Sequence, residues 1–122
     1  MSENSILVVD DHSITRQLSI KILKQLGVES ILEATNGQEA LDLLSDQTVG
    51  LILLDLSMPV MDGAEMLKHL KADDRLENIP VVMITAAAEQ NKVDEALELG
   101  ADLCILKPVA KQALSDIIMK YL

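Results

Sequence analysis

Short, uninterrupted runs of aliphatic residues recur along the chain, and they limit the fold more than any other feature of the sequence. Four of them contain no charged residue, and they lie at residues 6–9, 51–54, 81–84 and 103–106. Runs that do not alternate with polar residues predict strands buried on both faces, as in a parallel sheet. A fifth run, residues 30–34, contains Glu33 and is predicted to be an edge strand.

Amphipathic segments separate these runs, and their period is that of a helix. In the first segment Ile14, Leu18, Ile22 and Leu26 step by four, and Gly27 is placed to end the helix. The other four predicted stripes are Ala40, Leu41 and Leu44; Met66, Leu67 and Leu70; Val93, Ala96 and Leu97; and Ala110, Ala113, Leu114, Ile117, Ile118 and Tyr121. Asn36, assisted by Glu39, and Asp62 are expected to cap the amino ends of their helices. Gly100 is expected to end the helix that precedes it. The alternation predicts an α/β fold, a doubly wound parallel sheet of five strands flanked by five helices.

The overall composition narrows the class of protein. With 122 residues the chain is expected to form one domain, residues 1–122, with a core over about residues 5–122. A net charge of −10 argues against nucleic acid and anionic membranes as partners. The apolar runs are too short for membrane insertion, and Cys104 is the single cysteine, so a cytoplasmic location is expected.

Polar residues follow the predicted strands at the points where each run ends. They are Asp10, Asp11, Asp55, Thr85 and Lys107. Ligands of open parallel sheets bind at the carboxyl ends of the strands, so these side chains are expected to converge. Three neighbouring carboxylates repel one another, and a hard divalent cation such as Mg²⁺ relieves that repulsion. A carboxylate beside a metal, here Asp55, is placed to act as a nucleophile toward phosphorus.

Each of these residues also has a plainer interpretation. Asp10 and Asp11 could cap the helix that follows them, and Thr85 could simply end a strand. Lys107 could be a solvated lysine or could pair with one of the two aspartates. Its following residue, Pro108, permits a cis peptide bond that could hold the lysine inward.

Four sequence segments together resemble one protein family. They are Val-Val-Asp-Asp at residues 8–11, Leu-Leu-Asp-Leu-Ser-Met-Pro-Val-Met-Asp-Gly at 53–63, Ile-Thr-Ala at 84–86 and Leu-Lys-Pro at 106–108. In this order and spacing they resemble the receiver domain of two-component response regulators, particularly the single-domain chemotaxis type, over residues 5–122. The resemblance implies a flavodoxin-like sheet with strand order 2-1-3-4-5.

The resemblance also implies a role for each site residue. Asp55 would be the phosphoacceptor, taking a phosphoryl group from a sensor histidine kinase or a His-phosphotransfer protein. Asp11, Asp55 and the backbone carbonyl of Ser57 would hold Mg²⁺ (or Mn²⁺), and Asp10 would act mainly through metal-bound water. Lys107 would pair with a phosphoryl oxygen, and Thr85 would swing its hydroxyl toward the phosphoryl group.

The expected switch departs from the family at one position. The family usually carries Tyr or Phe three residues before the lysine, where this chain has Cys104. We interpret Cys104 as a small buried hydrophobe, so the signal would leave Thr85 through the loop that begins at Ala86. Ser57 and Ala87 are small, which predicts a site open to water. The expected output is a contact between a separate target protein and the surface of the last two helices and the fifth strand.

Competing interpretations make different demands on the sequence. A haloacid-dehalogenase-type enzyme needs a second aspartate two residues after Asp55, where Ser57 stands. A flavodoxin-like electron carrier needs a glycine-rich loop after the first strand, where the chain reads Asp-His-Ser-Ile at residues 11–14. The chain is therefore expected to act on no external substrate, although it should assist its own phosphorylation and dephosphorylation. Two alternatives stay open: a phosphorylation-independent interaction module, and a receiver fragment of a larger regulator.

Overall fold

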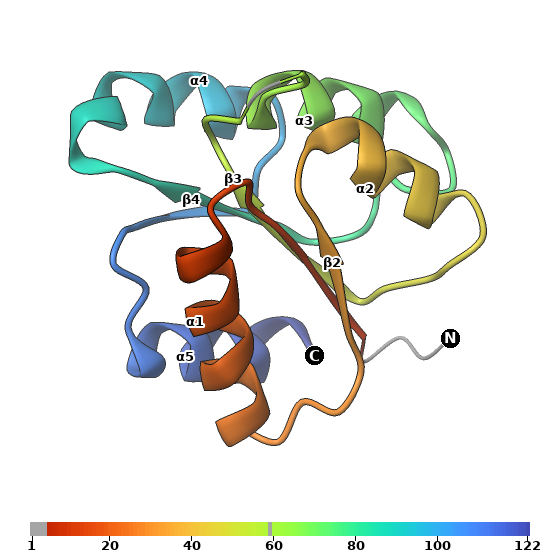
Figure 1. The fold of residues 1–122 in the computed structure, drawn as a ribbon. Coiled ribbons are helices and arrows are strands. Elements are labelled where there is room, and N and C mark those ends of the chain that lie inside the picture. The colour runs from red at the N-terminus through yellow and green to blue at the C-terminus, as the bar shows by residue number, and fades with distance from the viewer. Residues whose placement is uncertain (1–4, 59) are drawn as a thin grey trace.

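Five parallel strands form one sheet, with helices on both of its faces (Figure 1). The computed structural model describes residues 5–58 and 60–122, so residues 1–4 of the predicted domain and Pro59 of the second segment lie outside the described part. The strand order is β2-β1-β3-β4-β5, which confirms the predicted fold class. The elements are β1 (Ile6–Val9), α1 (Ser13–Gln25), β2 (Ile31–Ala34), α2 (Gly37–Leu44), β3 (Leu51–Asp55), α3 (Gly63–Ala72), β4 (Val81–Thr85), the 3₁₀ helix η1 (Ala87–Lys92), α4 (Val93–Glu98), β5 (Leu103–Leu106) and α5 (Lys111–Tyr121).

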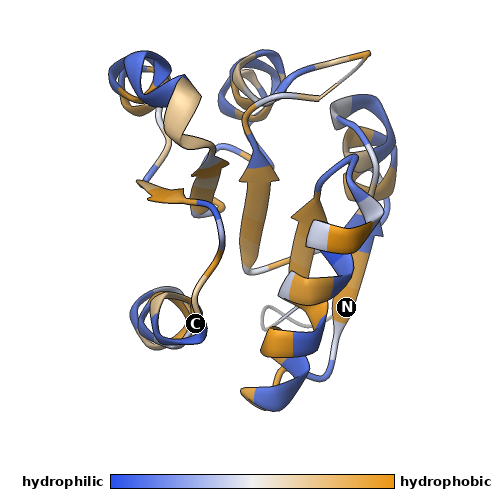
Figure 2. Ribbon diagram, turned by 60° about the vertical axis from the view of Figure 1, so that its left-hand side comes forward, coloured by the Kyte–Doolittle hydropathy of each residue, from blue (hydrophilic) through white to orange (hydrophobic). Residues whose placement is uncertain are grey.

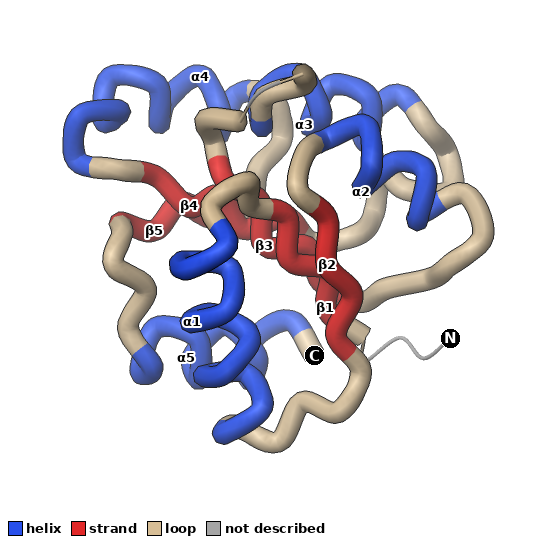
Figure 3. Tube along the Cα trace, viewed as in Figure 1, coloured by secondary structure: helices blue, strands red, loops and turns tan. Residues whose placement is uncertain are grey.

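The strands separate two layers of helices. α1 and α5 cover one face of the sheet, and α2, α3 and α4 cover the other (Figures 1 and 3). Successive side chains of a strand point to opposite faces, so Ile6 and Val8 of β1 pack with α1 and α5, while Leu7 and Val9 join the core under the other three helices. Figure 2 shows the resulting pattern, with apolar strands between helices that contain both hydrophobic and hydrophilic residues.

Burial follows each strand's place in the sheet. The central strands β1, β3 and β4 are buried throughout, and β2 lies at an edge, as predicted. The expectation that residues 103–106 are buried on both faces is wrong. β5 is the other edge strand, with β4 as its single neighbour, and Leu106 is 50% exposed. Composition alone does not reveal which strand ends the sheet.

The predicted apolar stripe of the first helix is wrong in its first half, whereas Ile22 and Leu26 are partly buried and pack against the core under α1 and α5. Ile14 is 84% exposed and Leu18 is 45% exposed, whereas Ser19, Ile20 and Leu23 are the buried residues of α1. Each step of four residues turns about 40° past a full revolution of the helix, so a stripe spaced by fours drifts away from the sheet. In the fourth helix Ala96 is buried but Leu97 is 43% exposed, so only part of that predicted stripe faces the sheet.

The predicted helix ends are confirmed. Asn36 accepts a hydrogen bond from Glu39 N–H, and Asp62 accepts one from Glu65 N–H, each at 2.8 Å. Glu39 does reach back, although its carboxylate accepts from Thr35 N–H at 3.0 Å, one residue before the cap. The two glycines that follow α1 and α4 adopt the left-handed backbone conformation, with φ +94° for Gly27 and +111° for Gly100.

Among the described helices, none is long and apolar enough to cross a membrane.

Candidate functional site

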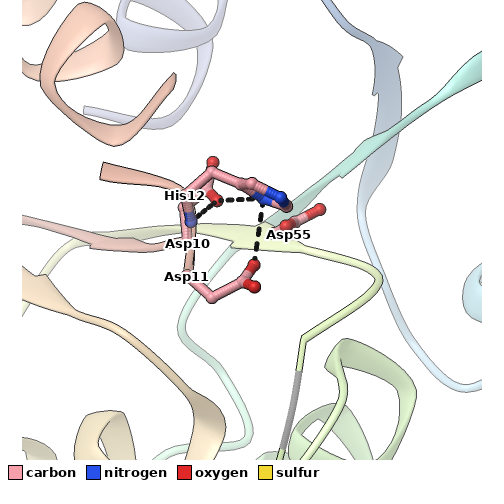
Figure 4. A group of neighbouring side chains, drawn as sticks. All are labelled: Asp10, Asp11, His12 and Asp55. Carbon is pink, nitrogen blue, oxygen red and sulfur yellow. Dashed lines mark hydrogen bonds and ion pairs between the residues drawn. The ribbon is translucent and has the colours of Figure 1, made fainter. Parts of the chain in front are cut away.

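The carboxyl ends of four strands bring the predicted polar residues to one edge of the sheet. Asp55 and Thr85 end β3 and β4, and Asp10 and Lys107 follow β1 and β5. Ligand atoms of Asp10, Asp11, His12 and Asp55 all lie within 4.8 Å of one another (Figure 4). Lys107 Nζ lies 3.2 Å from Asp55 Oδ1. Parallel strand polarity therefore assembles the cluster from residues up to 97 positions apart (from Asp10 to Lys107).

Asp10 is held in place by the start of α1. Its Oδ1 accepts a hydrogen bond from His12 N–H at 2.9 Å, and its Oδ2 accepts one from the Thr15 hydroxyl at 2.8 Å. The Arg16 guanidinium donates to the Asp10 carbonyl oxygen at 2.8 Å. The N-cap position of α1 belongs to His12, so neither aspartate is the N-cap residue. Both carboxylate oxygens of Asp10 are thus already engaged.

Asp11 and Asp55 differ from Asp10 in their lack of hydrogen bonds. Among the described residues, Oδ1 of Asp11 and both carboxylate oxygens of Asp55 are buried and accept none. Their nearest polar neighbours are the Lys107 ammonium, 3.2 Å from Asp55 Oδ1, and the His12 imidazole, whose Nδ1 lies 3.2 Å from Asp11 Oδ1. Buried carboxylate oxygens without donors are costly unless a cation or another group satisfies them.

The charge balance of the site favours a bound cation. Burial, followed by the charge of Asp10, raises the pKa of Asp55 from 3.8 to about 6, and Lys107 opposes the shift. Unsatisfied carboxylate oxygens are the ligands that hard divalent cations such as Mg²⁺ prefer. The residues present therefore fit such an ion, with Asp11 and Asp55 offering free oxygens and Asp10 better placed for a supporting role.

Thr85 and Lys107 are tied to neighbouring segments. The Thr85 hydroxyl donates to Ile105 O at 3.4 Å and accepts from Gln90 Nε2 at 3.2 Å, so it contacts β5 and η1. Lys107 N–H donates to Thr85 O at 2.8 Å, and the Lys107–Pro108 peptide is cis. The hydroxyl that is expected to move is therefore held by two partners in this state.

Gly63 sets how closely α3 approaches the site, and the sequence pattern did not reveal this. A Cβ at this position would lie 2.5 Å from Asp55 O and 2.9 Å from Leu56 Cα, both backbone atoms. Gly63 N–H donates to Leu56 O at 2.9 Å. Only a residue without a side chain permits this contact between the helix start and the strand that carries Asp55.

Cys104 occupies the position at which the family usually has an aromatic residue. It pairs with Met83 in the sheet and packs against the core under α2, α3 and α4. Burial raises the pKa of its thiol, which lowers the fraction of reactive thiolate. These contacts agree with the interpretation of Cys104 as a small hydrophobe, but the side chain is half-buried rather than buried, because β5 ends the sheet.

Several residues at the site were not expected. Thr15 and Arg16 position Asp10, and no spacing rule distinguished them from other helix residues. Glu89 accepts hydrogen bonds from the Ser57 hydroxyl and from Ala86 N–H, the latter at 3.0 Å. Because Ser57 is engaged by Glu89, its small size does not by itself make the site open. Ala87 begins η1 and is exposed.

The comparisons with known proteins agree with this geometry. The sequence model of the family described as "Response regulator receiver domain" matches residues 6–119. The chain belongs to this family. The receiver domain is 36% identical over 115 residues to the chemotaxis protein CheY of Pseudomonas aeruginosa, covering 94% of this chain and 93% of the relative. It is 37% identical over 112 residues to a CheY homologue of Campylobacter jejuni, covering 91% and 86%.

Solved structures resemble this receiver domain across nearly its whole length. The signal receiver domain of a histidine kinase from Syntrophus aciditrophicus superposes with a TM-score of 0.88 at 33% identity, covering 97% of this chain and 89% of that one. The Vibrio cholerae chemotaxis protein CheY4 gives the same TM-score at 27% identity, covering 99% and 100%. The fold and the order of its strands are those of the receiver family.

Proposed function

We propose that this receiver accepts a phosphoryl group on Asp55 and passes the signal on by protein–protein contact. The state of the Asp55 side chain carries the proposal. It is 1% exposed, its two oxygens accept no hydrogen bond among the described residues, and an ammonium lies 3.2 Å away. A buried carboxylate whose one close partner is an ammonium costs stability when it is ionised, but it is available to attack phosphorus.

The reaction needs little beyond positioning and charge compensation. The phosphoryl group would come from a phosphohistidine of a sensor histidine kinase or a His-phosphotransfer protein. The N–P bond breaks, an O–P bond forms to Asp55, and the imidazole nitrogen keeps the electron pair. Lys107 is placed to compensate the charge of the phosphoryl oxygens. Thr85 would give up its bond to Ile105 and donate to the phosphoryl group instead.

A divalent cation, Mg²⁺ or Mn²⁺, fits the same site. Asp11, Asp55 and the backbone carbonyl of Ser57 would hold it, and Asp10 would contribute through water because its own oxygens are engaged. When bound, the cation supplies positive charge that offsets the carboxylates and the phosphoryl oxygens. The chain would act on no external substrate.

Two exposed apolar surfaces suit the partners of such a receiver. Ile14 and Leu18 project from α1 beside Asp10 and Asp11, where a phosphodonor protein must approach. Leu97 and Leu106 are exposed on α4 and β5. On the other face of β5, a hollow of about 220 Å³ lies between this strand and α5. We assign the first surface to the donor and the α4, β5 and α5 surface to a separate target protein.

Intact mass measurement after incubation with Mg²⁺ and acetyl phosphate tests the proposal. We expect a single phosphoryl adduct on the native protein and none on Asp55→Asn, whose amide cannot form an acyl phosphate. Asp74→Asn, in an exposed turn, is the matched control and should be labelled like the native protein. A native protein without an adduct would contradict the proposal and favour a phosphorylation-independent interaction module.

A further inference from the structure

The carboxylate of Glu89 joins the two loops that border Asp55. Its Oε1 accepts a hydrogen bond from Ala86 N–H at 3.0 Å, and its Oε2 accepts one from the Ser57 hydroxyl. Ser57 follows Asp55 by two residues, and Ala86 directly follows β4. One glutamate therefore connects the loop after β3 to the loop after β4, at the edge of the sheet where the phosphoryl group would be carried.

Helix capping accounts for only half of this arrangement. Ala86 is the N-cap residue of η1, and Glu89 N–H donates to Ala86 O at 2.9 Å. The alanine side chain cannot accept a hydrogen bond, so the bond between Glu89 Oε1 and Ala86 N–H serves the end of η1. The bond to Ser57 spans 32 residues and adds nothing to η1 itself. It is a tertiary contact between the two loops.

Phosphorylation of Asp55 would compete with this contact. A phosphoryl group adds about −1.5 to −2 charge and three strong acceptor oxygens. Two donors on the loops after β3 and β4, the Ser57 hydroxyl and Ala86 N–H, are already bonded to the Glu89 carboxylate. Glu89 and the phosphoryl group would carry the same sign of charge and would seek the same donors, so they disfavour each other.

We propose that Glu89 is a positioning residue that holds the two loops together before phosphorylation and is displaced by the phosphoryl group. The inference rests on the proposed function of Asp55. Gln90, the next residue of η1, donates to the Thr85 hydroxyl at 3.2 Å. Release of Glu89 and release of Thr85 therefore involve the same short segment, which leads directly into α4. The signal can leave the site by this route without an aromatic residue at position 104.

Three variants test the inference. Glu89→Gln keeps the size of the side chain and removes its charge, and Ser57→Ala removes the donor on the other loop without touching η1. Glu77→Gln is the matched control, because it makes the same charge change at an exposed position before the amino end of β4. The initial rate of adduct formation with acetyl phosphate and saturating Mg²⁺ is followed by intact mass at low ionic strength.

We expect Glu89→Gln to be labelled about fivefold faster than the native protein. This factor corresponds to removing the repulsion between two like charges about 4 Å apart in water. Ser57→Ala keeps the charge of Glu89 and removes a donor that the phosphoryl group would use, so it should show no such gain, and Glu77→Gln should match the native rate. Because salt screens exposed charges, the advantage of Glu89→Gln should shrink at high ionic strength. A purely structural role of Glu89 would not produce that salt dependence.

A measurement on the unphosphorylated, metal-free protein gives independent information. The NMR signal of the Ala86 amide proton should move upfield in Glu89→Gln, because a bond to a charged acceptor becomes a bond to a neutral one. An unchanged or lower labelling rate of Glu89→Gln at low salt overturns the inference, and so does an Ala86 amide signal unaffected by the substitution. Absence of any adduct on the native protein would instead overturn the proposed function, so the two failures are distinguishable.

Discussion

Replacement of Asp55 with asparagine tests the electrostatic description of the site most directly. In the metal-free protein, burial and the charge of Asp10 raise the pKa of Asp55 from 3.8 to about 6. Between these values the folded state holds a proton that the unfolded chain has released, so the free energy of unfolding falls as pH rises. Two pKa units correspond to about 3 kcal/mol, which is fully lost above the folded-state pKa.

Asparagine at this position carries no charge at any pH, so it avoids that loss. In EDTA at about pH 7.5, we expect Asp55→Asn to raise the free energy of unfolding by about 3 kcal/mol, measured by urea denaturation. At about pH 4 the gain should nearly vanish, because the native carboxyl is then protonated when folded. Asp74→Asn, which is exposed, should show little change at either pH. A gain that is absent near neutral pH, or equal at both pH values, would refute the reasoning.

Four further outcomes are expected. Mg²⁺ should raise the urea midpoint of the native protein but not that of Asp55→Asn, since ligands stabilise the state that binds them; equal shifts would exclude Asp55 as a ligand. Lys107→Ala should raise the pKa of Asp55 further, because the opposing ammonium is lost, and a carboxyl NMR titration that shows no rise contradicts this. Gly63→Ala should cost about 1–3 kcal/mol in denaturation through backbone overlap, whereas Gly37→Ala should cost much less because it meets the flexible Met61 side chain; equal costs would contradict the overlap argument. Asn36→Ala should cost about 1 kcal/mol through the lost cap, and an unchanged midpoint would rule that cap out.

The predicted site residues lie close together because their positions depend on strand polarity. Once the aliphatic runs are assigned to parallel strands, the residues after them must share one edge of the sheet. Strand polarity alone therefore predicts that Asp10, Asp55 and Lys107 lie close together. It could not separate Asp10, whose oxygens are engaged by Thr15 and His12 N–H, from Asp11, whose Oδ1 accepts no hydrogen bond among the described residues. Such distinctions depend on side-chain direction, which the strand pattern does not contain.

The sequence by itself determined the alternation of strands and helices, the ends of the helices and the convergence of the acidic residues. The first two follow from periodicity and capping chemistry, which act over a few residues, and the third follows from the polarity that all parallel strands of one sheet share. Only the tertiary structure decided which faces are buried. Leu106 is exposed because β5 ends the sheet, and Ile14 is exposed because the sheet contacts another side of α1. The bond between Ser57 and Glu89 likewise depends on two loops meeting in space, so no local pattern could predict it.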